Sequence, residues 1–260
     1  MAFYLLRRSI SNGAIMGNVF TDSLETYFQN LKLVLLFSIP FIIAVAIPLF
    51  APLPTYITAG GIFLRSASIF INTSPVSISV IIFSMFFSLL FLSFAFVAIS
   101  LIVKSRRTHT KIAGSVLKDI EKYISRVFVV LLVYALVVIA TNILASYYLP
   151  SLGGVLTSLV GFIAFLIIFY APSAIVVDNK RILTSIKDST KLMYREPLCF
   201  LGWLLLSTIS ISILDVVAIG ITGTLLSRYV VLIITSLLIL PYFVILQAEA
   251  YMKRFPLLRH

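Results

Sequence analysis

Long apolar segments alternate with short amphipathic ones along the whole chain. A helix needs about 20 mostly apolar residues to cross a membrane, and six segments reach that length. They are Leu31–Leu53, Val76–Val103, Val127–Leu149, Val155–Val177, Leu198–Ile219 and Tyr229–Tyr251. Their apolar runs are continuous, whereas membrane-spanning strands alternate between apolar and polar positions. The pattern therefore predicts an all-α, polytopic membrane protein with six transmembrane helices.

Three amphipathic segments precede the first, third and fifth spans. By helical spacing, each segment has one apolar face and one polar or charged face. The apolar faces consist of Met16, Phe20, Leu24 and Tyr27 in the first segment, Ile112, Val116, Leu117, Ile120, Tyr123, Ile124 and Val127 in the second, and Ile182, Leu183, Ile186 and Met193 in the third. Helices of this kind lie in the membrane interface. We expect all three along the cytoplasmic face, with Asn12 and Asn179 as helix N-caps.

An amphipathic helix followed by a transmembrane hairpin is a unit that recurs three times, at about 12–103, 108–177 and 179–252. If each unit starts and ends on the same side, the repeats are parallel and related by an axis along the membrane normal. The alternative is that any six-span chain with cytoplasmic loops looks repetitive. The first outer loop, Pro54 to Pro75, is long enough for a surface helix, which we expect at Ile57–Ile71.

Prolines interrupt three of the six spans. Pro40 and Pro48 lie in span 1, Pro172 near the inner end of span 4 and Pro241 in the middle of span 6. Each proline removes a backbone donor and kinks the helix unless neighbours satisfy the freed carbonyl. Such kinks shape a cavity or serve packing only, and the sequence leaves both readings open.

Composition supports the membrane class, and the charge distribution gives an orientation. The chain is 61% hydrophobic and 11% charged, with a mean hydropathy of +1.14. Of its 20 Lys and Arg residues, all but Arg65 and Arg228 lie on one predicted side. The positive-inside rule then places both termini in the cytoplasm of a multi-pass plasma-membrane protein. The net charge of +11 is thus a topology signal, and no nucleic-acid partner is expected.

Asp215 is the sharper of two acidic residues within the predicted spans. Thr208, Ser212 and Asp215 are spaced at i, i+4 and i+7, which forms one polar stripe on an apolar helix. An ionisable residue at membrane depth is a functional-site candidate, so we expect this stripe to face into the bundle as a small-solute or proton site. The alternatives are a hydrogen-bonded packing contact or an aspartate that reaches the outer headgroups near Arg228.

The remaining candidates are weaker. Glu249 lies near the inner end of span 6, where we expect it to pair with a basic residue of a cytoplasmic helix. Asn72 begins an Asn-Thr-Ser glycosylation sequon in the first outer loop. Cys199 is the only cysteine and is expected to be a small helix residue. No catalytic, metal-binding or cofactor-binding motif stands out, so no enzyme activity, metal or cofactor is predicted.

Three stretches carry a family resemblance. They are Tyr170–Asp178 (YAPSAIVVD), Ile186–Leu192 (IKDSTKL) ending at Glu196-Pro197, and Pro241 with Ala248–Tyr251 (AEAY). They resemble the six-helix membrane domain attached to some bacterial glycerophosphoryl diester phosphodiesterases and its free-standing prokaryotic relatives of unknown function. The resemblance covers roughly the last 95 residues and implies no activity, because no catalytic residue carries over.

The leading functional hypothesis is a non-enzymatic accessory or scaffold protein that acts on lipids or partner membrane proteins. Three amphipathic helices and very few ionisable groups at membrane depth motivate it. The rival is a six-span permease subunit whose cytoplasmic helices dock a separate ATPase. An intramembrane enzyme of lipid metabolism is a third class, and it would need a second polar cluster facing Asp215.

Overall fold

The structure is a computed structural model that describes residues 19–50, 55–58, 61–64, 75–108, 115–149 and 151–254. Helices form nearly all of it. In chain order the elements are a helical segment at 19–29, α2 (Leu31–Phe50), β1 (Thr55–Thr58), β2 (Gly61–Leu64), α4 (Pro75–Thr108), α5 (Ser115–Tyr148), α6 (Gly153–Ile168), α7 (Ala171–Asp178), α8 (Ile182–Arg195), α9 (Pro197–Ile234), the π-helix η1 (Thr235–Ile239) and α10 (Leu240–Arg254).

Six helical stretches in the described chain are long and apolar enough to cross a membrane. They run over Leu31–Pro48, Ser79–Arg106, Ile120–Tyr148, Gly153–Asp178, Pro197–Thr224 and Leu226–Lys253. Each overlaps one predicted span, so the class of a six-helix, multi-pass membrane protein is confirmed. The fourth and sixth spans are each built from more than one helix, because α6 gives way to α7 and η1 interrupts the run into α10.

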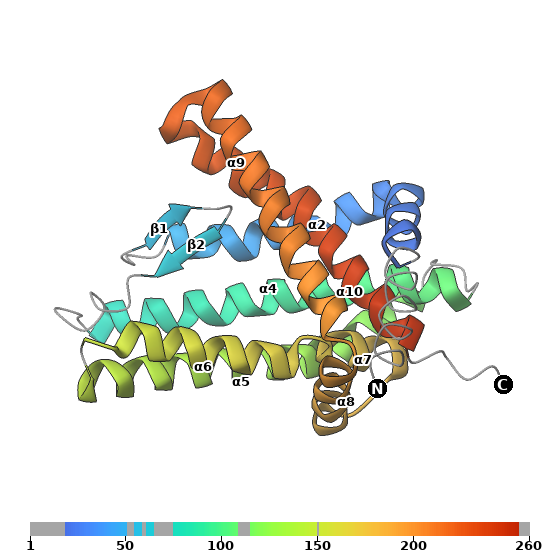
Figure 1. The fold of residues 1–260 in the computed structure, drawn as a ribbon, viewed down its shortest axis with the longest axis horizontal. Coiled ribbons are helices and arrows are strands. Elements are labelled where there is room, and N and C mark those ends of the chain that lie inside the picture. The colour runs from blue at the N-terminus through green and yellow to red at the C-terminus, as the bar shows by residue number, and fades with distance from the viewer. Residues whose placement is uncertain are drawn as a thin grey trace, which may run out of the picture.

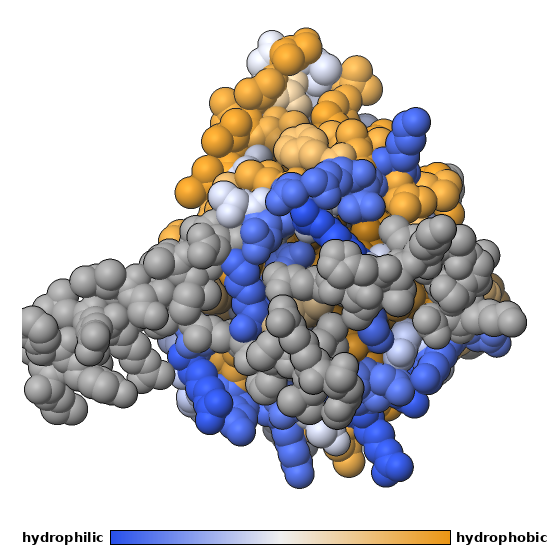
Figure 2. Space-filling view, turned by 90° about the vertical axis from the view of Figure 1, so that its right-hand side faces the viewer, coloured by the Kyte–Doolittle hydropathy of each residue, from blue (hydrophilic) through white to orange (hydrophobic). Residues whose placement is uncertain are grey.

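The spans fall into two groups (Figure 1). Helices α2, α4, α5 and α6 lie side by side, whereas the hairpin of α9 and α10 is inclined across them. Segment 19–29, α7, α8 and the last turns of α10 gather at one end, which we call the α8 end. The strands and the α5–α6 turn lie at the opposite end. Viewed from the α8 end, hydrophilic residues cluster there and hydrophobic ones cover the inclined hairpin (Figure 2).

A strand hairpin occupies the described part of the loop between α2 and α4, so the helix expected at Ile57–Ile71 is wrong over residues 57–58 and 61–64. The rest of that range lies outside the described residues. Strands β1 and β2 pair antiparallel, with Tyr56 opposite Phe63 and Thr58 opposite Gly61. Threonine, isoleucine and aromatic side chains favour the extended backbone because they pack well on a pleated surface. The hydrophobic spacing of this short loop is compatible with a helix or with strands, and the β propensity of its residues favours the strands.

The three amphipathic segments behave differently from one another. Segment 19–29 is separated from α2 by a single turn residue, Asn30, and α8 is a separate helix. The second segment is wrong as a separate interfacial helix, because from Ser115 onward it continues without a break as the first turns of α5. Its apolar residues Ile120, Tyr123 and Val127 pack in a core cluster with residues of α4 and α7. The apolar face of this segment is therefore covered by α4 and α7. The segment belongs to α5 and does not form a helix of its own.

The proline residues have specific structural compensation. Pro48 leaves the carbonyl of Ala44 without its helical donor, and the Ser88 hydroxyl of α4 donates to that oxygen at 2.5 Å. Pro241 is the second residue of α10 and lies two residues after η1, whose wider turns end at Ile239. Because a π-turn bonds five residues apart, it absorbs the missing proline donor within the helix. These two prolines therefore serve the continuity and packing of spans 1 and 6.

Glycines form two of the turns. A Cβ on Gly153 would lie 3.0 Å from the Ser146 backbone, so glycine allows the start of α6 to approach the end of α5. Gly223 has φ of 74° and ψ of 172°, which breaks α9 into two helical parts. Because L-residues with a side chain rarely adopt this φ, Gly223 sets the turn between spans 5 and 6.

Candidate functional site: the polar layer around α10

The C-terminal part of α10, at the α8 end, carries polar side chains on two opposite faces. Gln247 and Tyr251 are four residues apart and share one face, and Glu249 and Lys253 share another. The first pair contacts α7 and its neighbours, because Gln247 reaches Phe169 and Tyr251 reaches Asp178. The second pair contacts segment 19–29, through Thr26 and Asp22. Helix α10 therefore ties α7 on one side to the amphipathic segment 19–29 on the other.

Lys180 is the centre of the first group, in the loop between α7 and α8. Its ammonium lies 2.8 Å from Asp178 Oδ2 and 2.7 Å from Asp188 Oδ2, and it donates to the Tyr251 hydroxyl at 3.0 Å. That hydroxyl donates in turn to Asp178 Oδ2 at 2.6 Å. Burial alone lowers the pKa of Lys180, but the hydrogen bonds to Asp178, Asp188 and Tyr251 outweigh it and raise the pKa above the usual lysine value. Lys180 is therefore held as a cation that joins α7, α8 and α10.

Cationic side chains surround the C-terminal end of α7. Lys104 of α4 donates to the Val176 carbonyl at 2.8 Å, and Arg126 of α5 donates to the Asn179 side chain at 3.0 Å. The last carbonyls of a helix carry partial negative charge and lack helical donors, so these cations stabilise the end of α7. The N-cap expected at Asn179 is wrong. Asn179 is the C-cap of α7 with φ of 53°, a left-handed conformation that asparagine tolerates better than most residues.

The second group is built around Glu249, whose side chain is buried. Thr26 of segment 19–29 donates to Glu249 Oε1 at 3.1 Å. Arg106 of α4 donates to the same threonine hydroxyl and forms an ion pair with Glu25 at 2.8 Å. Glu249 is therefore linked to an amphipathic segment through Thr26, and its expected pairing with a basic residue stays a prediction. Arg106 was missed as a site residue because a lysine- and arginine-rich loop gives no signal that one side chain turns inward.

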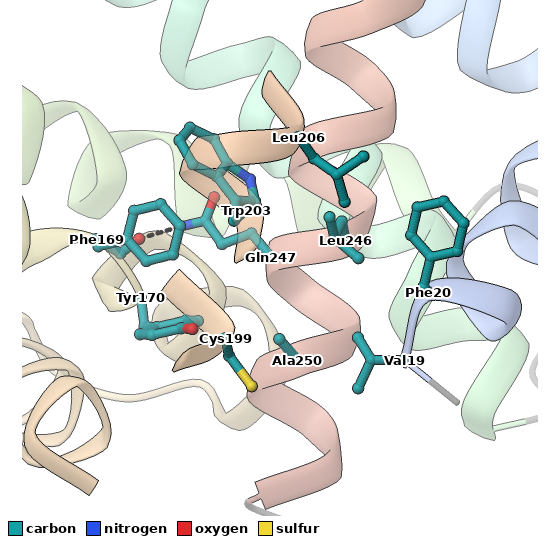
Figure 3. A pocket seen from close by; sticks show the side chains of 10 residues that line it. All are labelled: Val19, Phe20, Phe169, Tyr170, Cys199, Trp203, Leu206, Leu246, Gln247 and Ala250. Carbon is teal, nitrogen blue, oxygen red and sulfur yellow. Dashed lines mark hydrogen bonds between the residues drawn. The ribbon is translucent and has the colours of Figure 1, made fainter. Parts of the chain in front are cut away.

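Span 4 breaks between α6 and α7, and side chains satisfy the break. Pro172 lies in the first turn of α7, where a missing donor costs little. The Gln247 side-chain amide donates to the Phe169 carbonyl, and the Tyr170 amide donates to Ser189 Oγ of α8 at 3.0 Å. Figure 3 shows Gln247 reaching this carbonyl between Trp203 and Tyr170. Residues around them, including Cys199 and Leu246, line a cavity of about 20 Å³, which is room for one water molecule.

Helix α8 packs mainly through the apolar face that its hydrophobic spacing predicts, because Ile182, Ile186 and Met193 pack against the core clusters. Ser185, Ser189 and Leu192 are its buried residues, whereas Leu183, expected on the apolar face, is 75% exposed. Small hydroxyl residues let helices approach closely and form hydrogen bonds between them, and Ser189 accepts one from the Tyr170 amide at the span-4 break. The exposed side retains Leu183 and Tyr194 (85% exposed) beside exposed lysines Lys187 and Lys191.

The stripe of Thr208, Ser212 and Asp215 lies away from the polar layer, on the inclined hairpin. The expectation that it faces into the bundle is wrong, because Thr208 and Ser212 are exposed and Asp215 is half-buried. Only 6% of span 5, Pro197–Thr224, is buried inside the structure. A polar stripe on a helix does not by itself indicate which side of a span packs against other helices. Here the neighbouring helices contact the other side of α9.

The other predicted positions add no chemistry. Asn72 lies outside the described residues, as do Asn12 and Arg65. Cys199 is half-buried near the start of α9. Among the described residues, no group of three or more His, Cys, Asp and Glu side chains is close enough to hold a metal ion. The polar layer is thus a set of hydrogen-bonded ion pairs that fixes helices to one another.

Comparisons with known proteins gave no match to any family model, curated protein or solved structure. The resemblance to the phosphodiesterase membrane domain therefore stays a prediction. Its quoted stretches do meet in space, because Asp178, Asp188 and Tyr251 all contact Lys180. Asp178, Asp188 and Tyr251 were not predicted as site residues, and their occurrence in these three stretches is the signal that could have found them.

Proposed function

We propose that the protein is a non-enzymatic, multi-pass protein of the plasma membrane that acts as a scaffold or accessory on lipids or partner membrane proteins. Its termini lie in the cytoplasm in this proposal, so the α8 end faces the cytoplasm. The basic residues of that end support the orientation through the positive-inside rule. The resemblance to the phosphodiesterase membrane domain is part of the same proposal and adds no activity to it.

The exposed side of α8 is the observation that carries the proposal. Leu183 and Tyr194 project from it with exposed fractions of 75% and 85%, and Lys187 and Lys191 are exposed beside them. Tyrosine together with lysine is typical of the membrane–water interface, where the ring lies among headgroups and the ammonium meets anionic lipid. Because Lys180 and Ser189 anchor the opposite side of α8, this surface is held in a fixed position.

Site-specific photo-crosslinking tests the proposal. A photoreactive residue in place of Tyr194 is expected to form adducts with phospholipid or with a membrane protein in intact cells. The matched control replaces Glu121, which is exposed on α5, and should react much less with those targets. Adducts from Tyr194 with a soluble ATPase would support the permease-subunit alternative instead, and the absence of any adduct above the control would contradict both.

A further inference from the structure

An apolar groove opens between spans 4 and 5 where α8 closes their inner ends. Its walls are α6 and α9 and its floor is α8 and Phe200, and it encloses about 530 Å³. Its lining includes Ile163, Ile167, Thr190, Tyr194, Phe200 and Leu201. We call it the α6–α9 groove. Its volume falls within the range typical of small-molecule sites.

The groove exists because α9 diverges from α6. The two helices contact each other at the α8 end through Phe165 and Phe200, whose ring centroids are 6.3 Å apart. Beyond that point the α9–α10 hairpin inclines away from α6 (Figure 1). Phe200 is 3% exposed, whereas Ile163 and Leu201 on the two walls are 49% and 47% exposed. The base is therefore closed by packed aromatic rings and the side remains open.

The position of the groove limits what can occupy it. Both walls belong to helical stretches that are apolar enough to span a membrane, so the open side faces the hydrocarbon of the bilayer. An apolar cavity does not hold water well, and acyl chains are the apolar molecules abundant at that depth. The one end with polar character is α8, where Thr190 and Tyr194 line the groove.

Two lysines give this end a charge preference. Lys187 precedes Thr190 by three residues and Lys191 precedes Tyr194 by three, so each lies beside a groove-lining residue on the surface of α8. Both lysines are exposed. We propose that the α6–α9 groove binds one acyl chain of an anionic phospholipid, with the headgroup at Lys187 and Lys191. This rests on the proposed interfacial role of α8 and names the lipid class that it takes.

The single tryptophan of the chain provides the assay. Trp203 lies on α9 with its ring 6.4 Å from the Phe200 ring at the groove base, so a brominated acyl chain in the groove quenches its fluorescence. The protein is reconstituted in phosphatidylcholine vesicles, and an increasing fraction of either phosphatidylglycerol or phosphatidylcholine carries the bromine. Wild-type protein is expected to be quenched at a lower fraction of brominated phosphatidylglycerol. Each lysine should contribute about fivefold to that preference.

Variants separate the groove from lipid that merely surrounds the protein. Lys187→Gln and Lys191→Gln should each lower the preference about fivefold, whereas Lys122→Gln, an exposed lysine of α5, should leave it unchanged. Leu201→Phe fills the groove and should reduce quenching by both lipids. Ile213→Phe, on an exposed part of the same helix, should not. Thermal unfolding of each variant checks that it remains folded.

Equal quenching by the two lipids in the wild type would overturn the proposal, as would a preference that neither lysine variant changes. Quenching that Leu201→Phe leaves intact in a folded protein would also overturn it. The scaffold role remains testable by itself when the photoreactive residue replaces Leu183, because Leu183 is exposed on α8 and does not line the groove. A negative crosslinking result together with the expected quenching pattern would instead reject the scaffold role and keep the lipid site.

Discussion

Removal of the Lys180 ammonium is the sharpest test of the polar layer, because this one cation joins α7, α8 and α10. Its side chain is 24% exposed, and its partners Asp178 and Asp188 are 16% and 23% exposed. Exposed ion pairs contribute about 0.2–1 kcal/mol, whereas breaking a fully buried pair costs about 3–5 kcal/mol. The Lys180 site lies between these limits. We therefore expect Lys180→Met to lower the free energy of unfolding by about 2 kcal/mol.

The assay is thermal unfolding of the purified protein in one detergent. For a chain of this size, about 2 kcal/mol corresponds to a fall in Tm of about 4–8 °C. Lys187→Met is the matched control, because Lys187 is an exposed lysine of α8 and should change stability by less than about 0.5 kcal/mol. Asp188→Asn should cost less in the Lys180→Met background than in the wild type, since the two groups are coupled. A Tm change for Lys180→Met no larger than that of the control would refute the reasoning.

The pH dependence of the same difference has a definite sign. The folded pKa of Lys180 is raised above the unfolded value of about 10.4. The charged lysine therefore stabilises the fold fully below about pH 10.4, and this contribution is lost as pH rises through the folded pKa. The stability difference between wild type and Lys180→Met should accordingly be constant from about pH 7 to pH 10. A difference that declines across that range would contradict the raised pKa.

Three further outcomes are expected. Gln247→Leu should lower the free energy of unfolding by about 1–3 kcal/mol, because it strands the buried carbonyl at the span-4 break, whereas Gln29→Leu at an exposed position should have little effect in the same melt. Asp215→Asn and Asp215→Leu should each change the free energy of unfolding by less than about 0.5 kcal/mol. A loss of more than about 1 kcal/mol for the leucine variant would indicate that Asp215 makes a buried hydrogen bond. In a Cys199→Ala background, a cysteine at Ser151 should react with an impermeant thiol reagent in intact cells and one at Lys187 should not; the reverse result would invert the proposed topology.

The positions of the spans could be predicted from sequence because long apolar runs are stable in only one environment, the lipid hydrocarbon. The interior of span 4 could not. Pro172 could have kinked a continuous helix or begun a new one, and its place in the first turn of α7 depends on Gln247 and Ser189, which are distant in sequence. Hydrogen bonds between segments that are distant in sequence produce no periodic pattern of residues, so they cannot be predicted from hydrophobic spacing.

The same limit explains the errors in α8 and α9. Hydrophobic spacing placed Leu183 on the apolar face of α8, but Leu183 is exposed, and the buried residues of α8 are Ser185, Ser189 and Leu192. A membrane protein packs small hydroxyl residues inside and leaves large apolar ones to the lipid, so hydrophobicity does not mark the protein-facing side. For the same reason the polar stripe ending at Asp215 did not indicate the bundle interior.

The π-helix η1 sets the rotational register of the whole inner end of α10. A π-turn contains one residue more than an α-turn, and one residue corresponds to about 100° of rotation about the helix axis. If the same residues formed an ordinary α-helix, the extra residue would rotate everything after Pro241 by that amount. Gln247 would then leave the Phe169 carbonyl, and Glu249 would leave Thr26. A single extra residue at the middle of span 6 therefore aligns both faces of α10 with their partners at its inner end.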